Sequence, residues 1–214
     1  MKIAINGFGR IGRLVFRLME EDNYFDVVAI NDLSTPEELA YLLKYDTNHR
    51  NYNKEITYDE ENIIIEGKKV RVYKEMDPTN LPWKELGIDL VFECTGKFTK
   101  EEDAMKHITA GAKKVLVSAP CKGNVKTVVY NVNDNILDDS DKIVSAASCT
   151  TNCLAPVLKL VDDNFGIIKG FMTTIHAYTN DQVTLDVSHK KGSHSRRWRA
   201  CAMNIVPTST GAAT

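Results

Sequence analysis

Along the chain, segments whose hydrophobic residues have the spacing of a β-strand alternate with segments whose hydrophobic residues have the spacing of an α-helix. Residues 2–6 form a short apolar run that predicts a strand. The next apolar residues recur at helical spacing and predict one buried stripe, which consists of Ile11, Leu14, Val15, Leu18 and Met19. A second apolar run, residues 27–31, predicts a strand that ends in Asp32. Strand, helix and strand in this order predict a parallel sheet of the α/β class.

The same rhythm predicts further elements towards residue 148. Two helices carry predicted capping boxes, Thr35 with Glu38 and Thr99 with Glu102. Between residues 49 and 77, short charged pieces of alternating pattern predict antiparallel strands inserted into the sheet. Further strands are expected at residues 89–94, 115–118, 128–130 and 143–145.

The last third of the chain has a different pattern. Cys149 opens a helical segment whose apolar face consists of Leu154, Val157, Leu158 and Val161. A long strand is expected at residues 167–178, and a further strand and turn at residues 204–211. The pattern breaks off at Thr214 before a sheet is complete.

Composition narrows the class of protein. The chain has 214 residues, of which 43% are hydrophobic and 26% charged, which is typical of a soluble globular protein. The net charge of -2 gives no overall attraction to nucleic acid or to an anionic membrane. No apolar run approaches the roughly 20 residues of a membrane span, and the N-terminus has no secretory signal. Five scattered cysteines do not form a disulfide framework or a zinc-binding spacing, so we expect a cytoplasmic protein.

The loop after the first strand carries glycines at the spacing of dinucleotide-binding proteins. It consists of Gly7, Phe8, Gly9, Arg10, Ile11 and Gly12. Glycine lets the backbone approach a pyrophosphate, which the start of the following helix stabilises. Asp32 is placed to accept hydrogen bonds from the adenosine ribose and to repel a 2′-phosphate. The glycines alone also fit a plain tight turn, but this context predicts a Rossmann-type domain over residues 1–148 that binds NAD rather than NADP.

Two other strand ends are expected at the same edge of the sheet. Thr95 and Gly96 follow one buried strand, and Ser118 follows the next. Ligands of doubly wound sheets bind at the carboxyl ends of the strands, so these residues are candidates for contact with the cofactor. Without the glycine loop they would be interpreted as simple turns.

Cys149 lies where a predicted strand hands over to a helix. The first N–H groups of a helix lack backbone partners and carry partial positive charge, which stabilises a thiolate. We therefore interpret Cys149 as a candidate nucleophile. The alternative is a buried structural cysteine beside polar caps.

His176 lies on the predicted strand at residues 167–178. A histidine on a strand is often only a structural hydrogen-bonding group, but an imidazole beside a thiol keeps the thiolate charged and accepts a proton. His176 is thus the candidate base for Cys149.

A basic cluster occupies residues 190–199 and contains Lys190, Lys191, Arg196, Arg197 and Arg199. Such a cluster can bind nucleic acid, but the acidic overall balance argues against this. A solvated or interface loop with an arginine that faces an anion fits the composition better.

Together these motifs resemble the phosphorylating glyceraldehyde-3-phosphate dehydrogenase family, in a bacterial form. The resemblance rests on the glycine loop, Asp32 and three later segments, which are residues 148–153, 176–182 and 207–211. It extends over essentially the whole chain, and the segment Ser-Cys-Thr-Thr-Asn-Cys is highly specific to that family.

The resemblance implies a glycolytic oxidation through a thioester on Cys149. Cys149 would attack the aldehyde of glyceraldehyde 3-phosphate, with His176 as the base and as the donor to the oxyanion. Hydride would pass to NAD, and inorganic phosphate would release 1,3-bisphosphoglycerate from the thioester. The family is usually a homotetramer. Its chains normally continue beyond the last residue here, so the resemblance also implies that residues 149–214 are the truncated N-terminal part of an α+β catalytic domain.

The resemblance also assigns binding residues. Those on the cofactor side are Gly7, Phe8, Gly9, Arg10, Ile11, Gly12, Asp32, Thr95, Gly96 and Ser118. Those that bind the substrate and phosphate are Ser148, Thr150, Thr179, Arg197, Thr210 and Gly211. No metal is implied.

Three alternatives stay open at this point. Erythrose-4-phosphate dehydrogenase shares the nucleophile segment but hydrolyses its thioester. A chain truncated at residue 214 could also be a catalytically silent NAD-binding fragment. Nucleic-acid binding through residues 190–199 is the third.

Overall fold

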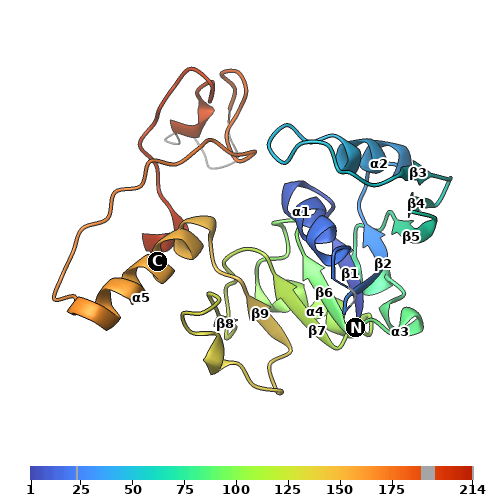
Figure 1. Ribbon diagram of the computed structural model, residues 1–214, viewed down its shortest axis with the longest axis horizontal. Coiled ribbons are helices and arrows are strands. Elements are labelled where there is room, and N and C mark those ends of the chain that lie inside the picture. Colours follow the sequence, from blue (N-terminus) through green and yellow to red (C-terminus); the bar gives the residue numbers. More distant parts are fainter. Residues whose placement is uncertain (23, 189–195, 214) are drawn as a thin grey trace. The chain divides into compact units, whose positions relative to one another are not determined.

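Within the described residues, a nine-stranded mixed sheet organises the first part of the chain (Figure 1). The computed structural model describes residues 1–22, 24–188 and 196–213, and the chain divides into two units, Met1–Ser148 and Cys149–Thr214. The strands are β1 (Lys2–Asn6), β2 (Asp26–Asn31), β3 (Ile56–Tyr58), β4 (Asn62–Ile65), β5 (Lys68–Tyr73), β6 (Leu90–Glu93), β7 (Lys114–Val117), β8 (Lys126–Thr127) and β9 (Ile143–Ser145). The α-helices are α1 (Arg10–Met19), α2 (Pro36–Lys44), α3 (Trp83–Leu86), α4 (Glu101–Thr109) and α5 (Cys149–Phe165).

The strand order is β3-β4-β5-β2-β1-β6-β7-β9-β8. All neighbouring pairs from β5 to β8 are parallel, whereas β3, β4 and β5 pair antiparallel with one another. The predicted doubly wound sheet and its antiparallel insertion are therefore confirmed. From β1 the chain passes to β2 on one side of β1, and later to β6 on its other side. The carboxyl ends of β1 and β6 therefore form the topological switch point, where such sheets bind ligands.

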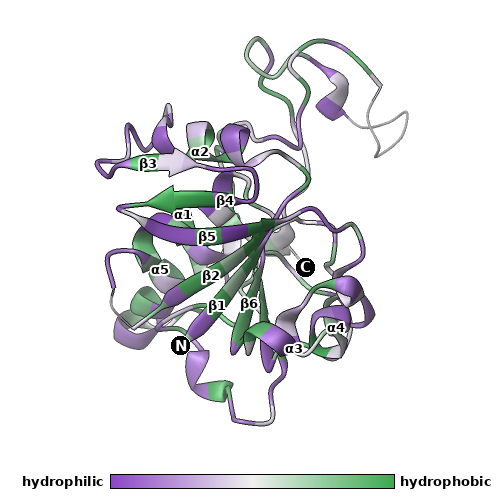
Figure 2. Ribbon diagram, turned by 90° about the vertical axis from the view of Figure 1, so that its right-hand side faces the viewer, coloured by the Kyte–Doolittle hydropathy of each residue, from purple (hydrophilic) through white to green (hydrophobic). Residues whose placement is uncertain are grey.

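The two faces of the sheet bury two separate hydrophobic cores. Ile3 and Ile5 of β1 belong to the core that also contains Phe16 of α1, whereas Ala4 belongs to the opposite core, which contains Trp83 of α3. This alternation is the period of two that a strand imposes on its side chains. Figure 2 shows hydrophobic residues along β4 and β6. Strand β6 is covered on both faces, because Val91 belongs to one core while Leu90 and Phe92 pack against the other.

Helix α1 forms where the apolar pattern predicts it. The predicted buried stripe is confirmed at Met19, which is buried, and Val15 packs against the core, but the prediction is wrong for Ile11 and Leu18. Gly12, Phe16 and Met19 face the core, while Ile11 and Leu18 are 48% and 58% exposed. The helix carries apolar residues on more than one face, so the periodicity alone does not select the buried face. The aromatic ring of Phe16, which is fully buried, occupies the core face instead.

The two predicted capping boxes have different outcomes. At α2, the Thr35 hydroxyl accepts from the Glu38 N–H and the Glu38 carboxylate accepts from the Thr35 N–H, so that box is confirmed. Helix α4 instead begins after Lys100 without any capping side chain, so the box of Thr99 with Glu102 is wrong. The segment before α4 is held by backbone hydrogen bonds to Lys122, and these replace the cap.

Three predicted strands are absent from the positions expected. At residues 128–130 the Val129 N–H donates to the Asn133 side chain and forms a turn, so β8 is limited to Lys126–Thr127. Residues 167–178 and 204–210 have no regular secondary structure. A strand needs a neighbour to satisfy its N–H and C=O groups, and no described segment pairs with these.

The second unit therefore consists of α5, two short 3₁₀ helices (Arg196–Trp198 and Gly211–Ala213) and irregular segments, as far as it is described. Helix α5 begins at Cys149, as predicted, and ends before Gly166, whose φ of 74° is left-handed. Its apolar face is not buried, since Thr150 is the one buried residue of this helix. In the described part of the chain, no helix has the length and apolar character needed to cross a membrane.

Candidate active site

The glycine loop closes against the end of β6. Gly7 has a φ of 89°, and a Cβ there would lie 2.7 Å from the Thr95 backbone nitrogen. A Cβ on Gly12 would overlap the Gly7 carbonyl oxygen. Both positions therefore require glycine for close packing, whereas a Cβ on Gly9 would meet nothing within 4 Å.

The loop fits a pyrophosphate. Helix α1 begins after Gly9, which supplies no capping side chain, and its first turn contains no acidic residue. The first N–H groups of α1 thus have no capping side chain and no acidic neighbour in the first turn, which favours an anion there. The predicted cofactor residue Arg10 has a different contact, because its guanidinium forms an ion pair with Asp46.

Asp32 lies directly after β2 and binds the glycine loop. Its Oδ2 accepts a 2.8 Å hydrogen bond from the Phe8 N–H, and its Oδ1 accepts from the Ser34 N–H at 3.0 Å. Phe8 itself is buried and its ring meets Phe16 edge to face, with 5.5 Å between the centroids. The structure thus brings the loop and the acid together, as the sequence predicts.

The ends of β6 and β7 lie beside each other through their strand pairing. Ser118 N–H donates to the Glu93 carbonyl oxygen at 3.0 Å, and Gly96 has a left-handed φ of 68°. Cys94 lies between Glu93 and Thr95, and burial raises the pKa of its thiol to about 12. Thr95, Gly96 and Ser118 therefore share the edge of the sheet with the glycine loop, while Cys94 stays protonated.

Cys149 and His176 meet in the second unit. The Cys149 Sγ lies 3.3 Å from His176 Nε2, and His176 Nδ1 lies 2.6 Å from the Ala177 carbonyl oxygen. A carbonyl oxygen can only accept, so Nδ1 carries a proton and Nε2 is the nitrogen that receives the thiol proton. The geometry is that of a thiol with its base.

Electrostatics favour transfer of that proton. Partial burial opposes ionisation of Cys149, but the hydrogen bonds to His176 and Thr150 and the charge of the His176 ring together outweigh burial, so the pKa of the thiol is lowered. The hydrogen bond to the Ala177 carbonyl, followed by that to Cys149, raises the pKa of His176. Both shifts stabilise a thiolate beside an imidazolium.

Arg197 is the arginine that the sequence analysis assigns to phosphate binding. Its guanidinium donates to the Thr208 hydroxyl at 3.1 Å and to the Ser209 carbonyl at 3.2 Å, and it pairs with Asp181 at 3.1 Å. The charge of Arg197 also acts on His176, because it opposes protonation of that ring. The charge of Arg197 therefore acts on the ring that faces Cys149.

The remaining predicted substrate residues lie in or next to the second unit. Thr150 is buried in the first turn of α5, directly after Cys149. Ser148 directly precedes Cys149 and is the last residue of the first unit. Gly211 begins a 3₁₀ helix that contacts α5, and Thr210 precedes it. Thr179 begins a turn in which its N–H donates to Gln182, at an exposed position. Lys190 and Lys191 of the predicted basic cluster lie outside the described residues.

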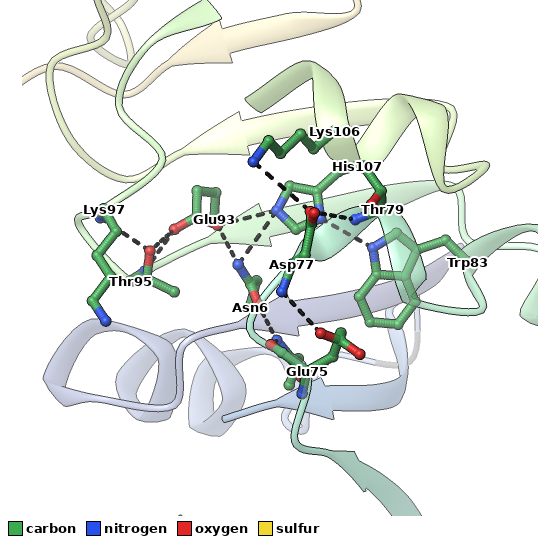
Figure 3. Close-up of polar contacts among 11 residues, drawn as sticks. Asn6, Glu75, Asp77, Thr79, Trp83, Glu93, Thr95, Lys97, Lys106 and His107 are labelled. Carbon is green, nitrogen blue, oxygen red and sulfur yellow. Dashed lines mark hydrogen bonds and ion pairs between the residues drawn. The ribbon is translucent and has the colours of Figure 1, made fainter. Parts of the chain in front are cut away.

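A buried polar network behind the glycine loop escaped the sequence analysis. Asn6, Glu93 and His107 are at most 1% exposed, and their side chains lie together with those of Thr95 and Trp83 (Figure 3). The available signal was the position of Glu93, a charged residue at the end of an otherwise apolar strand. Nothing in the spacing of the sequence points to His107, because the two residues meet only through the packing of α4 on the sheet.

Comparison with known proteins gives consistent matches over both units. Residues 1–101 match the family model described as "Glyceraldehyde 3-phosphate dehydrogenase, NAD binding domain", and residues 148–214 match "Glyceraldehyde 3-phosphate dehydrogenase, C-terminal domain". The glyceraldehyde-3-phosphate dehydrogenase of Clostridium pasteurianum is 58% identical over 212 residues, and that of Clostridium acetobutylicum is 57% identical over 212 residues. That of Mycoplasma pneumoniae is 54% identical over 214 residues. The alignments cover 99%, 99% and 100% of this chain and 63% of each relative, so the chain spans 63% of their length.

Proposed function

Because the chain belongs to the glyceraldehyde-3-phosphate dehydrogenase family, we propose that the protein oxidises glyceraldehyde 3-phosphate with NAD and inorganic phosphate. The product is 1,3-bisphosphoglycerate. The observation that carries this proposal is the 3.3 Å contact between Cys149 Sγ and His176 Nε2 at the first residue of α5. This pair supplies the nucleophile and the base that a covalent route needs.

The first step is addition of the Cys149 thiolate to the aldehyde carbon. A carbon–sulfur bond forms, the carbonyl π electrons move to oxygen, and His176 Nε2–H donates to the resulting oxyanion. When hydride leaves the carbon and the carbonyl re-forms, His176 accepts the proton of the thiohemiacetal hydroxyl. Electrostatic support of a developing oxyanion is a large contribution to catalysis of this kind.

NAD supplies the acceptor for the hydride that leaves the thiohemiacetal carbon. Three features of the first unit would hold it: the glycine loop with the start of α1 for the pyrophosphate, Asp32 for the adenosine ribose, and the edge formed by Thr95, Gly96 and Ser118 for further contacts with the dinucleotide. The open start of α1 and the close packing of Gly7 against Thr95 support this assignment.

The thioester on Cys149 is then attacked by inorganic phosphate, which expels the thiolate as leaving group. Thiolates of lowered pKa leave readily, and His176 stabilises the released charge. Arg197 is the described cation that would attract phosphate groups, and Ser148, Thr150, Thr179, Thr210 and Gly211 would supply hydroxyl and N–H donors. We further propose a cytoplasmic homotetramer.

The test is NADH formation by the purified protein with glyceraldehyde 3-phosphate, in the presence and absence of inorganic phosphate. Phosphate-dependent NADH formation that is lost in Cys149→Ser, with NAD binding retained, is the expected result. Phosphate-independent oxidation of erythrose 4-phosphate would identify the hydrolytic enzyme instead. NAD binding without acylation of Cys149 would identify a silent binding protein.

A further inference from the structure

Helix α1 buries two arginines, and the proposed chemistry uses neither. Arg13 and Arg17 are each 9% exposed and lie about one turn apart on the helix. Charged side chains are rarely buried unless their charge is paired and their hydrogen bonds are made. The contacts of each guanidinium therefore show what holds it in the protein interior.

The Arg17 guanidinium is held by the end of α2 and the segment that follows it. It donates to the backbone carbonyl oxygens of Leu43, His49 and Arg50, and it lies 5.0 Å from the centroid of the Tyr52 ring. None of these groups belongs to the glycine loop. Arg17 thus joins α1 to a neighbouring part of the fold, which is a structural role.

The Arg13 guanidinium binds the glycine loop instead. Its Nη1 donates to the Phe8 carbonyl oxygen at 2.9 Å, and the Arg13 backbone N–H donates to the Gly9 carbonyl oxygen at 3.1 Å. The Phe8 N–H donates to the carboxylate of Asp32. Two side chains of opposite charge therefore hold the two backbone polar groups of Phe8.

The hydrogen bond from Arg13 to Phe8 also sets the direction of the next N–H group. In a planar trans peptide the C=O and the following N–H point in opposite directions. Because the Phe8 carbonyl faces Arg13, the Gly9 N–H points away from the buried guanidinium. Gly9 is exposed, a Cβ there would meet nothing within 4 Å, and no described residue accepts a hydrogen bond from its N–H. An N–H in this setting, beside the uncapped start of α1, is suited to bind an anion.

The charge of Arg13 is only partly compensated by protein groups. Asp46 pairs with Arg10, no described carboxylate forms an ion pair with Arg13, and the Arg13 Nε has no hydrogen-bond partner among the described residues. Burial, followed by the charge of Arg10, lowers the pKa of Arg13, and the charges of Asp46 and Asp32 offset this only in part. A buried cation of this kind is stabilised by an anion bound nearby.

We propose that Arg13 is a positioning residue of the dinucleotide site, which orients the peptide between Phe8 and Gly9 and supplies a buried positive charge behind it. This rests on the proposed function, in which the glycine loop and the start of α1 hold the pyrophosphate. Because its guanidinium is buried, Arg13 acts through the loop and does not touch the cofactor. Loss of Arg13 therefore weakens NAD binding, whereas loss of Arg17 does not.

The test is titration of NAD into the Arg13→Met and Arg17→Met variants. Methionine keeps an apolar chain in the core and removes the charge, so each variant loses one of the two buried cations of the same helix. We expect the Kd for NAD to rise about tenfold in Arg13→Met, the effect of losing a hydrogen bond to a charged group, and to stay within about twofold in Arg17→Met. Thermal unfolding of both variants establishes that each is folded and gives the loss of stability that the two share.

Lysine variants test the charge and protect the comparison against misfolding. Arg13→Lys keeps the positive charge but lacks the planar fork of the guanidinium, so we expect a smaller rise in the Kd for NAD than in Arg13→Met. If Arg13→Met does not fold, Arg13→Lys and Arg17→Lys decide the question, because the Kd should then rise in Arg13→Lys alone.

Equal rises in the Kd for NAD in the Arg13 and Arg17 variants, or an unchanged Kd in Arg13→Met, would overturn the positioning role and leave the proposed function intact. A rise confined to the Arg17 variants would overturn it as well. If the unsubstituted protein binds no NAD, both the proposed function and this inference fail.

Discussion

The carboxylate of Asp32 accepts a 2.8 Å hydrogen bond from the backbone N–H of Phe8. The acid at the end of β2 therefore supports the glycine loop as well as the position proposed for the ribose. This double role predicts that substitutions of Asp32 affect the loop and the cofactor preference separately.

Asp32→Ala removes both roles, and we expect the affinity for NAD to fall about tenfold or more while binding of NADP becomes easier. Asp32→Asn is the matched control, since it retains an acceptor for the Phe8 N–H but lacks the charge that repels a 2′-phosphate. It should shift the preference towards NADP with a smaller loss for NAD. Titration of each variant with both cofactors measures the effect. An unchanged NAD/NADP preference in Asp32→Ala would contradict the ribose role.

Substitution by alanine should lower stability at one glycine of the loop and weaken NAD binding at another. Gly12→Ala places a methyl group on the Gly7 carbonyl oxygen, so we expect the free energy of unfolding to fall by about 1–3 kcal/mol or more. Gly9→Ala meets open space and should leave stability within roughly 0.5 kcal/mol, while it weakens NAD by blocking the approach of the pyrophosphate. Urea unfolding and NAD titration of both variants check this. Equal stability of the two variants would show that the loop is not closely packed.

The ion pair of Arg10 with Asp46 should make stability depend on pH in the acid range. Burial opposes ionisation of Asp46, but the N–H groups of His49 and Asn48 and the Arg10 guanidinium outweigh it and lower its pKa to about 2. A carboxyl with a lowered folded-state pKa stabilises the fold above its unfolded pKa of about 3.9, and this contribution disappears as the pH falls towards 2.

Asp46→Asn removes that contribution. We expect the variant to be less stable than the unsubstituted protein near pH 7, and the difference to shrink as the pH falls from about 4 towards 2. Urea midpoints measured across this range give the result. A difference that stays constant or grows on acidification would contradict the assigned shift.

The sequence predicts the first unit better than the second. The segment from β1 through the glycine loop and α1 to β2 was predictable because the glycines, the apolar runs and Asp32 that determine it all lie within about 30 residues of one another in the sequence. The buried face of α1 was not, since Ile11 and Phe16 are equally apolar and only packing on the sheet selects Phe16. Likewise, the strand expected at residues 167–178 has the right composition, but no described segment pairs with it.

The candidate site divides in the same way. Cys149 was predictable because a strand-to-helix junction can be read locally. Its distance to His176, 27 positions later, depends on the path of an irregular segment that no local pattern determines. In the buried network, Glu93 at the end of an apolar strand was a signal, but its contact with His107 was not predictable, because it joins β6 to α4 across the packed core.

The central claim, that Cys149 is a thiolate nucleophile paired with His176, can be tested by mapping iodoacetamide labelling against pH. Because the pKa of Cys149 is lowered and burial raises those of Cys94 and Cys121, Cys149 should be labelled far faster than either near neutral pH. His176→Asn should move the midpoint of the Cys149 profile to higher pH, since the neighbour that stabilises the thiolate is gone. Uniform labelling of the cysteines in the folded protein, or an unchanged Cys149 profile in His176→Asn, would contradict the claim.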